Sequence, residues 1–182
     1  GYAVKYQVLN AADYGVAQQR KRIFIVGIRE DLGVEYHFPA PTHGEGRAQP
    51  HTTIRQAIGD LPEWPTGEFY DLDFHWYYLS RNRRQGWEDT SKTIVANPRH
   101  MPLHPMSPAL KKLEHNVWQF ETEDRARRFS YREAARLQGF ATNFEFPDTA
   151  LGSLNIRYKV AGNAVPPPLF AAVARALPAV VD

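Results

Sequence analysis

Residues 23–27, with the sequence Ile-Phe-Ile-Val-Gly, constrain the fold more than any other part of the chain. A run of branched and aromatic side chains closed by a glycine predicts a strand that is buried on both faces. The five residues before it, 18–22, read Gln-Gln-Arg-Lys-Arg. Since side chains alternate along an extended chain, Gln18, Arg20 and Arg22 share one side. An arginine keeps its charge when it is desolvated. Arg20 and Arg22 therefore have two options. Either they need anionic or carbonyl partners, which a substrate could supply, or their side chains extend to water at the strand end.

Three segments carry sequence motifs. Residues 12–27 read ADYGVAQQRKRIFIVG and resemble the eighth motif of the DNA cytosine-5 methyltransferases, whose core is Gln-x-Arg-x-Arg. Residues 130–140, SYREAARLQGF, are similar to the ninth motif of that family, and residues 158–166, YKVAGNAVP, to the tenth. The family carries its target recognition domain between the eighth and ninth motifs, so the order and spacing agree as well. The chain thus resembles the C-terminal half of such an enzyme.

The resemblance implies roles for particular residues. Enzymes that modify a base inside a duplex rotate it out of the stack. By resemblance, Arg22 donates to the O2 atom of the flipped cytosine and stabilises charge as the ring is attacked, while Arg20 and Gln18 shape the pocket. Asn163 and Val165 would lie beside the cofactor, S-adenosylmethionine. The implied partner is double-stranded DNA.

The chain contains no cysteine, which excludes disulfides, thiolate metal sites and a cysteine nucleophile. The family adds a cysteine thiolate to carbon 6 of cytosine, because carbon 5 alone is too weakly nucleophilic to accept the methyl group. No strand is followed by a glycine-rich turn and a helix that would cradle an adenosyl cofactor, and Gly44 and Gly46 are predicted to lie in a loop. The nucleophile, the proton-handling glutamate and most of the cofactor site are therefore expected upstream of Gly1 or in a partner chain.

Composition narrows the class of protein only mildly. Of the 182 residues, 43% are hydrophobic, which suffices for a packed core. The sequence has no apolar run long enough to cross a membrane and no basic-then-apolar leader, so we predict no membrane span, no signal peptide and a cytoplasmic location. A net charge of +2 is compatible with nucleic-acid binding but does not argue for it.

The expected fold is α/β, with edge strands of a Rossmann-like methyltransferase sheet followed by a loop-rich mixed α/β target recognition domain. Residues 3–9 and 22–28 are predicted to pair as antiparallel strands. The expected division assigns residues 1–48 to strands of the catalytic domain and a linker, residues 49–127 to the target recognition domain, and residues 128–182 to returning helices with the ninth and tenth motifs.

Several local patterns fall within the predicted recognition domain. Apolar residues at positions 54, 57, 58 and 61 indicate a short helix, capped by Thr52 or Thr53 and ended by Gly59. Residues 92–95 are predicted to form a strand, and residues 117–120 to be core. His100 and His104 are spaced like metal ligands on a helix, but the prolines at 98, 102 and 105 forbid that helix, so no metal site is predicted.

A basic cluster, Arg81-Asn82-Arg83-Arg84, follows directly on the aromatic run 76–78. Flat side chains beside cations suit a phosphate backbone, and a solvated loop is the alternative. The predicted DNA contacts are Arg81, Arg83, Arg84, Lys92 and Arg99. The sequence does not determine which loop side chains reach base edges, and therefore does not determine the target site.

Ser130 and Glu133 have the spacing of a capping box, which predicts a helix that runs to Leu137 or Gln138 and stops at Gly139. Basic residues lie at its start and along one side, namely Arg127, Arg128, Arg132 and Arg136. These arginines are expected either to tie the recognition domain to the helix or to contact phosphate.

The C-terminal part is predicted to begin with an extended segment over residues 143–147. Residues 155–160 are interpreted as an approach to Gly162 and Asn163, which by themselves are also typical of a plain turn. Apolar residues at 169, 170, 173, 174 and 177 predict an amphipathic helix that ends near Pro178. By resemblance, this helix returns to the catalytic sheet and brings the end of the chain beside its start.

The predicted function is sequence-specific DNA recognition and base positioning within a cytosine-5 methyltransferase of the bacterial restriction-modification type. Three alternatives remain open at this point. The chain could be a catalytically inert DNA-binding module, a fragment of an RNA cytosine-5 methyltransferase, for which the recognition stretch is long, or a structural module that keeps the motifs without a substrate.

Overall fold

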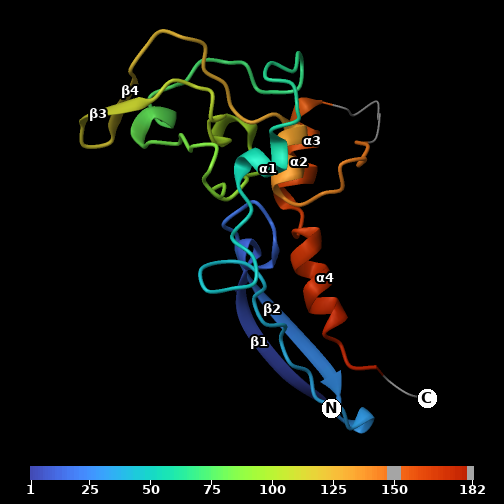
Figure 1. Cartoon of the computed structure of the whole chain (residues 1–182). Helices are drawn as coiled ribbons and strands as arrows, with labels where there is room; N and C mark the ends of the chain where they lie inside the picture. Colours follow the sequence, from blue (N-terminus) through green and yellow to red (C-terminus); the bar gives the residue numbers. More distant parts are fainter. Residues whose placement is uncertain (147–152, 180–182) are drawn as a thin grey trace.

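The structure, a computed structural model, describes residues 1–146 and 153–179. A long hairpin of β1 (Tyr2–Asn10) and β2 (Lys21–Arg29) forms one end of the molecule, with α4 (Pro167–Arg175) beside it. The other end holds three short helices, α1 (Ile54–Ile58), α2 (Tyr131–Leu137) and α3 (Leu154–Asn163), and a small hairpin of β3 (Leu110–Glu114) and β4 (Val117–Phe120) (Figure 1). Within the described ranges, no helix is long and apolar enough to cross a membrane.

The predicted pair of antiparallel strands is confirmed. Strands β1 and β2 pair from Tyr2 opposite Arg29 to Asn10 opposite Lys21, and a short 3-10 helix, Ala11–Tyr14, joins them. Gly15 ends that helix at a φ of 84°, a conformation that favours glycine. Because the connection between the strands is short, residues 18–20 lie immediately before the start of β2.

Burial on both faces of β2, which the run at 23–27 predicts, is not found in this chain. One face of the hairpin is exposed and apolar; it carries Tyr2, Val4, Tyr6, Val8, Ile23 and Ile25, each at least 58% exposed. The opposite face packs against α4, where Leu169 and Val173 share a core with Leu9 and Tyr36. A two-stranded sheet has no further layer to cover its second face, so the apolar side chains on that face stay exposed.

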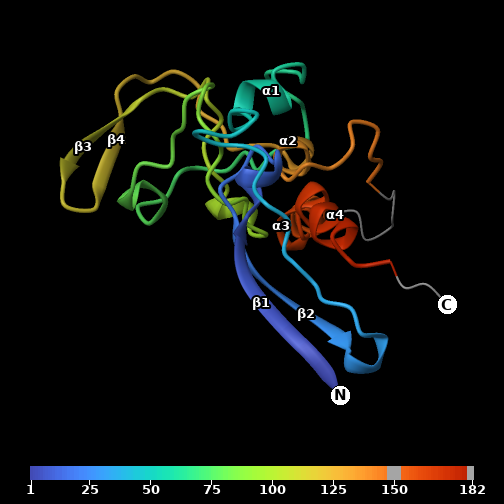
Figure 2. The ribbon, with the colours of Figure 1, turned by 60° about the horizontal axis from the view of Figure 1, so that its bottom comes forward.

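Helix α4 confirms the amphipathic helix predicted in the C-terminal part. Leu169 and Val173 are buried, whereas Phe170 is 56% exposed. The hydroxyl of Tyr36 donates to the carbonyl of Val173 over 3.1 Å, which fixes the helix against the linker that follows β2. Figure 1 shows α4 running alongside the hairpin, and Figure 2 shows the same helix from nearer its end, so the C-terminal helix returns to the first strands.

The second core lies among α1, α2 and α3. Both predicted caps are present: Thr53 and Gln56 form a capping box on α1, and Ser130 and Glu133 form one on α2. The buried apolar residues of this core come from all three helices and from the loops between them, at Ala17, Ile54, Ile58, Ile94, Met101, Phe129, Tyr131, Ala134, Ala135, Leu137, Tyr158 and Ala161. Residues from the predicted recognition segment and from the returning helices therefore share one core.

Residues 155–160, which the sequence analysis interprets as an approach to Gly162 and Asn163, lie within helix α3. The helix extends through Gly162 and Asn163, so this pair forms its last turn. A Cβ atom on Gly162 would lie 2.4 Å from the backbone nitrogen of Ala96. Glycine is needed here because the helix and the loop backbone approach so closely.

Three other local predictions are corrected. Residues 92–95 form no strand; the neighbouring Ser91 makes one isolated parallel bridge to Gln18. Residues 117–120 form strand β4, in which Val117 is 43% exposed while Trp118 and Phe120 are half-buried against a small core, so only alternate residues of this segment are core. A turn occupies positions 142 and 143 in place of a continuous extended segment, and Pro147 lies outside the described residues.

Candidate functional site

Gln18 lies at the junction between the loop before β2, the segment around Ile94 and the end of α2. It is fully buried, and its side-chain amide donates to Gln138 Oε1 over 2.9 Å. Its side-chain oxygen accepts from the backbone amide of Ile94 over 2.7 Å. Gln138 in turn donates to the carbonyl of Ala161 in α3 over 2.7 Å. This chain of hydrogen bonds links the segments of all three motifs in one buried network.

Arg20 belongs to the same junction. It is 4% exposed, and its terminal nitrogens donate to the carbonyls of Ile94 and Gly162, each over 2.9 Å. Burial, together with the nearby charge of Arg22, lowers the pKa of its guanidinium to about 10. The arginine therefore remains charged at neutral pH, and carbonyl oxygens of two distant segments compensate its desolvation.

Arg22 differs from its two motif neighbours. Its side chain is exposed, and within the described chain its guanidinium donates only to the carbonyl of Lys21, over 2.7 Å. The residues before it fix the backbone: Asn10 Oδ1 accepts from the amide of Arg20 over 3.0 Å. Asn10 also donates to Gln19 Oε1 over 2.7 Å. Arg22 thus extends from a braced strand end with its donors available to a ligand.

The predicted cofactor residues lie just beyond the same junction. Asn163 ends α3, and Val165 precedes the first turn of α4; both are exposed, Val165 by 48%. Arg20 and Gln138 hold the neighbouring carbonyls of Gly162 and Ala161, so the backbone just before Asn163 and Val165 is anchored to the junction.

The predicted DNA-binding residues fall into two groups. Arg84 donates to the carbonyls of Ser107 and Pro105 over 2.9 and 3.3 Å, and Arg83 donates to the carbonyl of Tyr78 over 3.1 Å. These contacts engage the guanidinium of Arg84 at two nitrogens and that of Arg83 only at Nε. The others, Arg81, Lys92 and Arg99, are exposed. Beside Arg81 stands the aromatic run, in which Trp76 is 81% exposed, so a basic and aromatic surface is present around residues 70–81 and 99–100.

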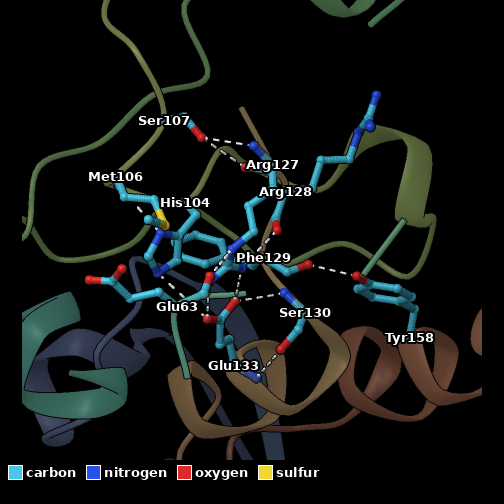
Figure 3. A network of polar contacts seen from close by, with 10 residues as sticks. All are labelled: Glu63, His104, Met106, Ser107, Arg127, Arg128, Phe129, Ser130, Glu133 and Tyr158. Atoms are coloured by element: carbon cyan, nitrogen blue, oxygen red, sulfur yellow. Dashed lines mark hydrogen bonds and ion pairs between the residues drawn. The ribbon is translucent and has the colours of Figure 1, made fainter. Parts of the chain in front are cut away.

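A buried ion pair closes the start of α2. Both terminal nitrogens of Arg127 donate to the carboxylate of Glu133, over 2.8 and 2.7 Å, and both residues are 1% exposed (Figure 3). The same carboxylate accepts from the backbone amide of Ser130 over 2.7 Å, completing the capping box. The planar fork of arginine matches the two carboxylate oxygens, so the pair is geometrically well satisfied.

His104 lies against this pair. Its Nε2 atom is 3.5 Å from Glu133 Oε1, but Arg127 already engages both carboxylate oxygens. Burial, together with the positive charge of Arg127, lowers the pKa of His104 to about 3, so the imidazole is neutral at physiological pH. Among the described residues, no group of three or more potential ligands could hold a metal ion.

Arg128 points to different partners from those of Arg127. It is 1% exposed and donates to the carbonyls of Tyr70, Leu72, Asp73 and Arg99. Its guanidinium lies over the rings of Phe74 and Tyr78, at 4.2 and 4.7 Å from their centroids. The sequence marks Arg128 as one of the basic residues near α2, but it does not indicate that Arg128 organises the aromatic loop.

The remaining arginines of α2 also make contacts within the protein. Arg132 donates to Glu68 over 2.7 Å, and Arg136 donates to Asp60 over 3.0 Å. Of the two expected roles for the basic residues around α2, the structure shows the first: they tie residues 60–73 to the helix.

Comparison with known proteins agrees with these features. A family model described as C-5 cytosine-specific DNA methylase matches residues 1–179. The chain is 42% identical over 182 residues to the type II methyltransferase M.BsuRI of Bacillus subtilis, covering 96% of this chain and 42% of that protein. It is 42% identical over 186 residues to M.MthTI of Methanothermobacter thermautotrophicus, covering 91% of this chain and 53% of that one. The chain therefore spans about half the length of the curated relatives it matches.

A solved structure shares the fold. The methyltransferase EhMeth of Entamoeba histolytica superposes with a TM-score of 0.60 at 17% identity, over 96% of this chain and 52% of that chain. The hairpin is therefore part of an α/β methyltransferase fold, of which this chain contains a portion. The matched motifs, the family model over almost the whole chain and the shared fold agree: the chain belongs to the C-5 cytosine-specific DNA methylase family.

Proposed function

We propose that this chain is the DNA-recognition and base-positioning part of a DNA (cytosine-5-)-methyltransferase of the restriction-modification type. In this proposal, the whole enzyme transfers a methyl group from S-adenosylmethionine to a cytosine in a specific duplex site. The observation that carries the proposal is the contrast within one motif. Gln18 and Arg20 are buried and join three segments of the chain, whereas the Arg22 side chain is exposed and, within the described chain, donates only to the carbonyl of Lys21.

The proposed division of labour follows from this geometry. Arg22 would donate to the O2 atom of a flipped cytosine, and Arg20 and Gln18 would shape the pocket by fixing its backbone. Asn163 and Val165 would contact S-adenosylmethionine, most of whose site belongs to the part of the enzyme that this chain lacks. The proposed domain boundaries are residues 1–48, 49–127 and 128–182.

The exposed face of the β1–β2 hairpin supports a missing catalytic half as partner. Six large apolar side chains on that face, from Tyr2 to Ile25, are each at least 58% exposed. A contiguous apolar surface of this kind marks an interaction site. Since this chain covers about half of its relatives, we propose that the nucleophile-bearing half, in the same polypeptide or in a separate subunit, covers the hairpin.

The chain alone is expected to transfer no methyl group, because it contains no cysteine that could add to carbon 6 of cytosine. The measurement is incorporation of labelled methyl from S-adenosylmethionine into duplex DNA, with a complete family member as the positive control. Adding the nucleophile-bearing half should restore incorporation. Label in cytosine above background with the chain alone would refute the prediction, and no activity after reconstitution would favour an inert DNA-binding module.

Arg81→Ala is expected to weaken DNA binding to all sequences and to reduce the slope of log K against log salt concentration by about 0.9 for one lost phosphate contact. The matched control is Arg84→Ala, because the Arg84 guanidinium is held by the carbonyls of Ser107 and Pro105. That variant should lower the free energy of unfolding and leave the salt slope nearer to wild type. An unchanged slope for Arg81→Ala would show that this residue does not contact phosphate.

A further inference from the structure

A cleft lies on the basic and aromatic surface. It has a volume of about 300 Å³ and is lined by Tyr70, Leu72, Asp73, His75 and Arg99. Its walls come from two segments that are distant in sequence, residues 70–75 and Arg99. A surface cleft made from two loops has a defined shape only if something holds the loops together.

Arg128 holds both walls. Its Nε atom donates to the carbonyl of Arg99 over 3.3 Å, and its terminal nitrogens donate to the carbonyls of Tyr70, Leu72 and Asp73 over 3.2, 2.8 and 3.3 Å. All four acceptors belong to residues that line the cleft. A buried cation that has only carbonyl and aromatic partners requires them to stay in place, because losing one leaves charge uncompensated. The cleft is therefore a built feature of the fold.

Arg99 presents an ordered guanidinium on one wall of this cleft. Its Nε atom donates to the hydroxyl of Tyr70 over 2.8 Å, and its backbone amide donates to Asn97 Oδ1 over 3.0 Å. Among the described residues, its terminal nitrogens have no hydrogen-bond or ion-pair partner. Two free N–H groups in a fixed fork can bind two adjacent acceptors, and the anchored Nε lowers the entropic cost of doing so.

The negative charge of Asp73 restricts which ligands can bind in the cleft. Asp73 is an exposed residue, and it lines the same cleft as Arg99. A carboxylate repels a phosphate group, so a pure backbone contact is disfavoured there. A ligand that offers acceptors to Arg99 and a donor to Asp73 suits both. The major-groove edge of a G·C base pair has this pattern, because guanine presents O6 and N7 as acceptors and cytosine presents its N4 amino group as a donor.

We propose that this cleft reads a G·C base pair in the target site, with Arg99 donating to guanine O6 and N7 and Asp73 accepting from cytosine N4. Arg128 is a positioning residue that holds both readers. The inference rests on the proposed DNA-recognition function and deepens it, since it assigns base reading to two residues and separates them from the phosphate contacts.

The test is a binding selection from a random duplex library with the 182-residue chain, followed by affinity measurements on the selected sequence. Wild type should enrich one sequence. Arg99→Ala should lose preference at one guanine, with a drop of about tenfold to a hundredfold in discrimination against the other bases at that position. Asp73→Asn should relax preference at the same base pair. The matched control is Arg81→Ala, which should weaken all sequences alike and leave the preference intact.

A base analogue makes the assignment specific. Replacing that guanine by 7-deazaguanine, which lacks the N7 acceptor, should weaken binding by wild type but cause little further loss with Arg99→Ala, because the same contact is already gone. If Arg99→Ala keeps the wild-type preference, or weakens all sequences equally, the inference is wrong and the proposed function survives. If wild type enriches no sequence, the proposed recognition function fails, and the inference fails with it.

Discussion

Arg22→Ala in the complete enzyme is expected to cut the rate of methyl transfer by about a hundredfold or more, the scale seen when one donor to a developing oxyanion is removed. Negative charge builds on the cytosine O2 atom as the ring is attacked, so the hydrogen bond is stronger in the transition state than in the ground state. DNA affinity should fall much less, because phosphate contacts dominate it. The measurements are the single-turnover rate and the DNA dissociation constant.

Two further variants separate the roles within this motif. Arg22→Lys should not restore the rate, since lysine lacks the planar fork. Arg20→Lys should instead lower stability, because the carbonyls of Ile94 and Gly162 lose a donor pair that spans both segments. Circular dichroism and denaturation check folding in each case. A rate that survives Arg22→Ala, or a rate and affinity that fall in proportion, would show that Arg22 is a structural or phosphate-binding residue.

Breaking the buried pair between Arg127 and Glu133 is expected to give the largest loss of stability of any single ion pair in the described chain. Arg127→Met leaves a carboxylate buried without its partner, and Glu133→Gln leaves a buried guanidinium. Each change should cost about 3–5 kcal/mol in the free energy of unfolding. The double variant should cost clearly less than the sum of the two, since neither uncompensated charge remains. Urea denaturation of the four proteins measures this cycle.

A matched control is available on the same helix. Arg136 pairs with Asp60, whose side chain is 62% exposed, so Asp60→Asn should cost no more than about 1 kcal/mol. If Arg127→Met costs as little as this control, the buried pair does not hold the start of α2. A change in the urea dependence of unfolding would point to an altered denatured state instead.

Several features were predictable because neighbouring residues determine them. The capping boxes at Thr53 and Ser130 depend on side chains three positions away, and the apolar run at 23–27 that predicts a strand is likewise local. The amphipathic pattern of α4 is equally a matter of spacing along one helix. Where local signals were weak, the sequence failed: the strand predicted over residues 92–95 is absent, and no element was predicted for residues 155–160, which form part of α3.

The amino-acid sequence by itself thus determined the family, the hairpin, the caps of α1 and α2, and the returning helix. Only the tertiary structure decided what each arginine does. Arg20 and Arg22 are chemically identical and two positions apart, yet Arg20 bonds to carbonyls 74 and 142 positions away while Arg22 remains exposed. Arg128 and Arg99 differ in the same way: Arg128 is buried and donates to loop carbonyls, whereas Arg99 is exposed. The physical reason is that a guanidinium's role depends on which acceptors the folded chain brings to it, and those acceptors come from segments far apart in sequence.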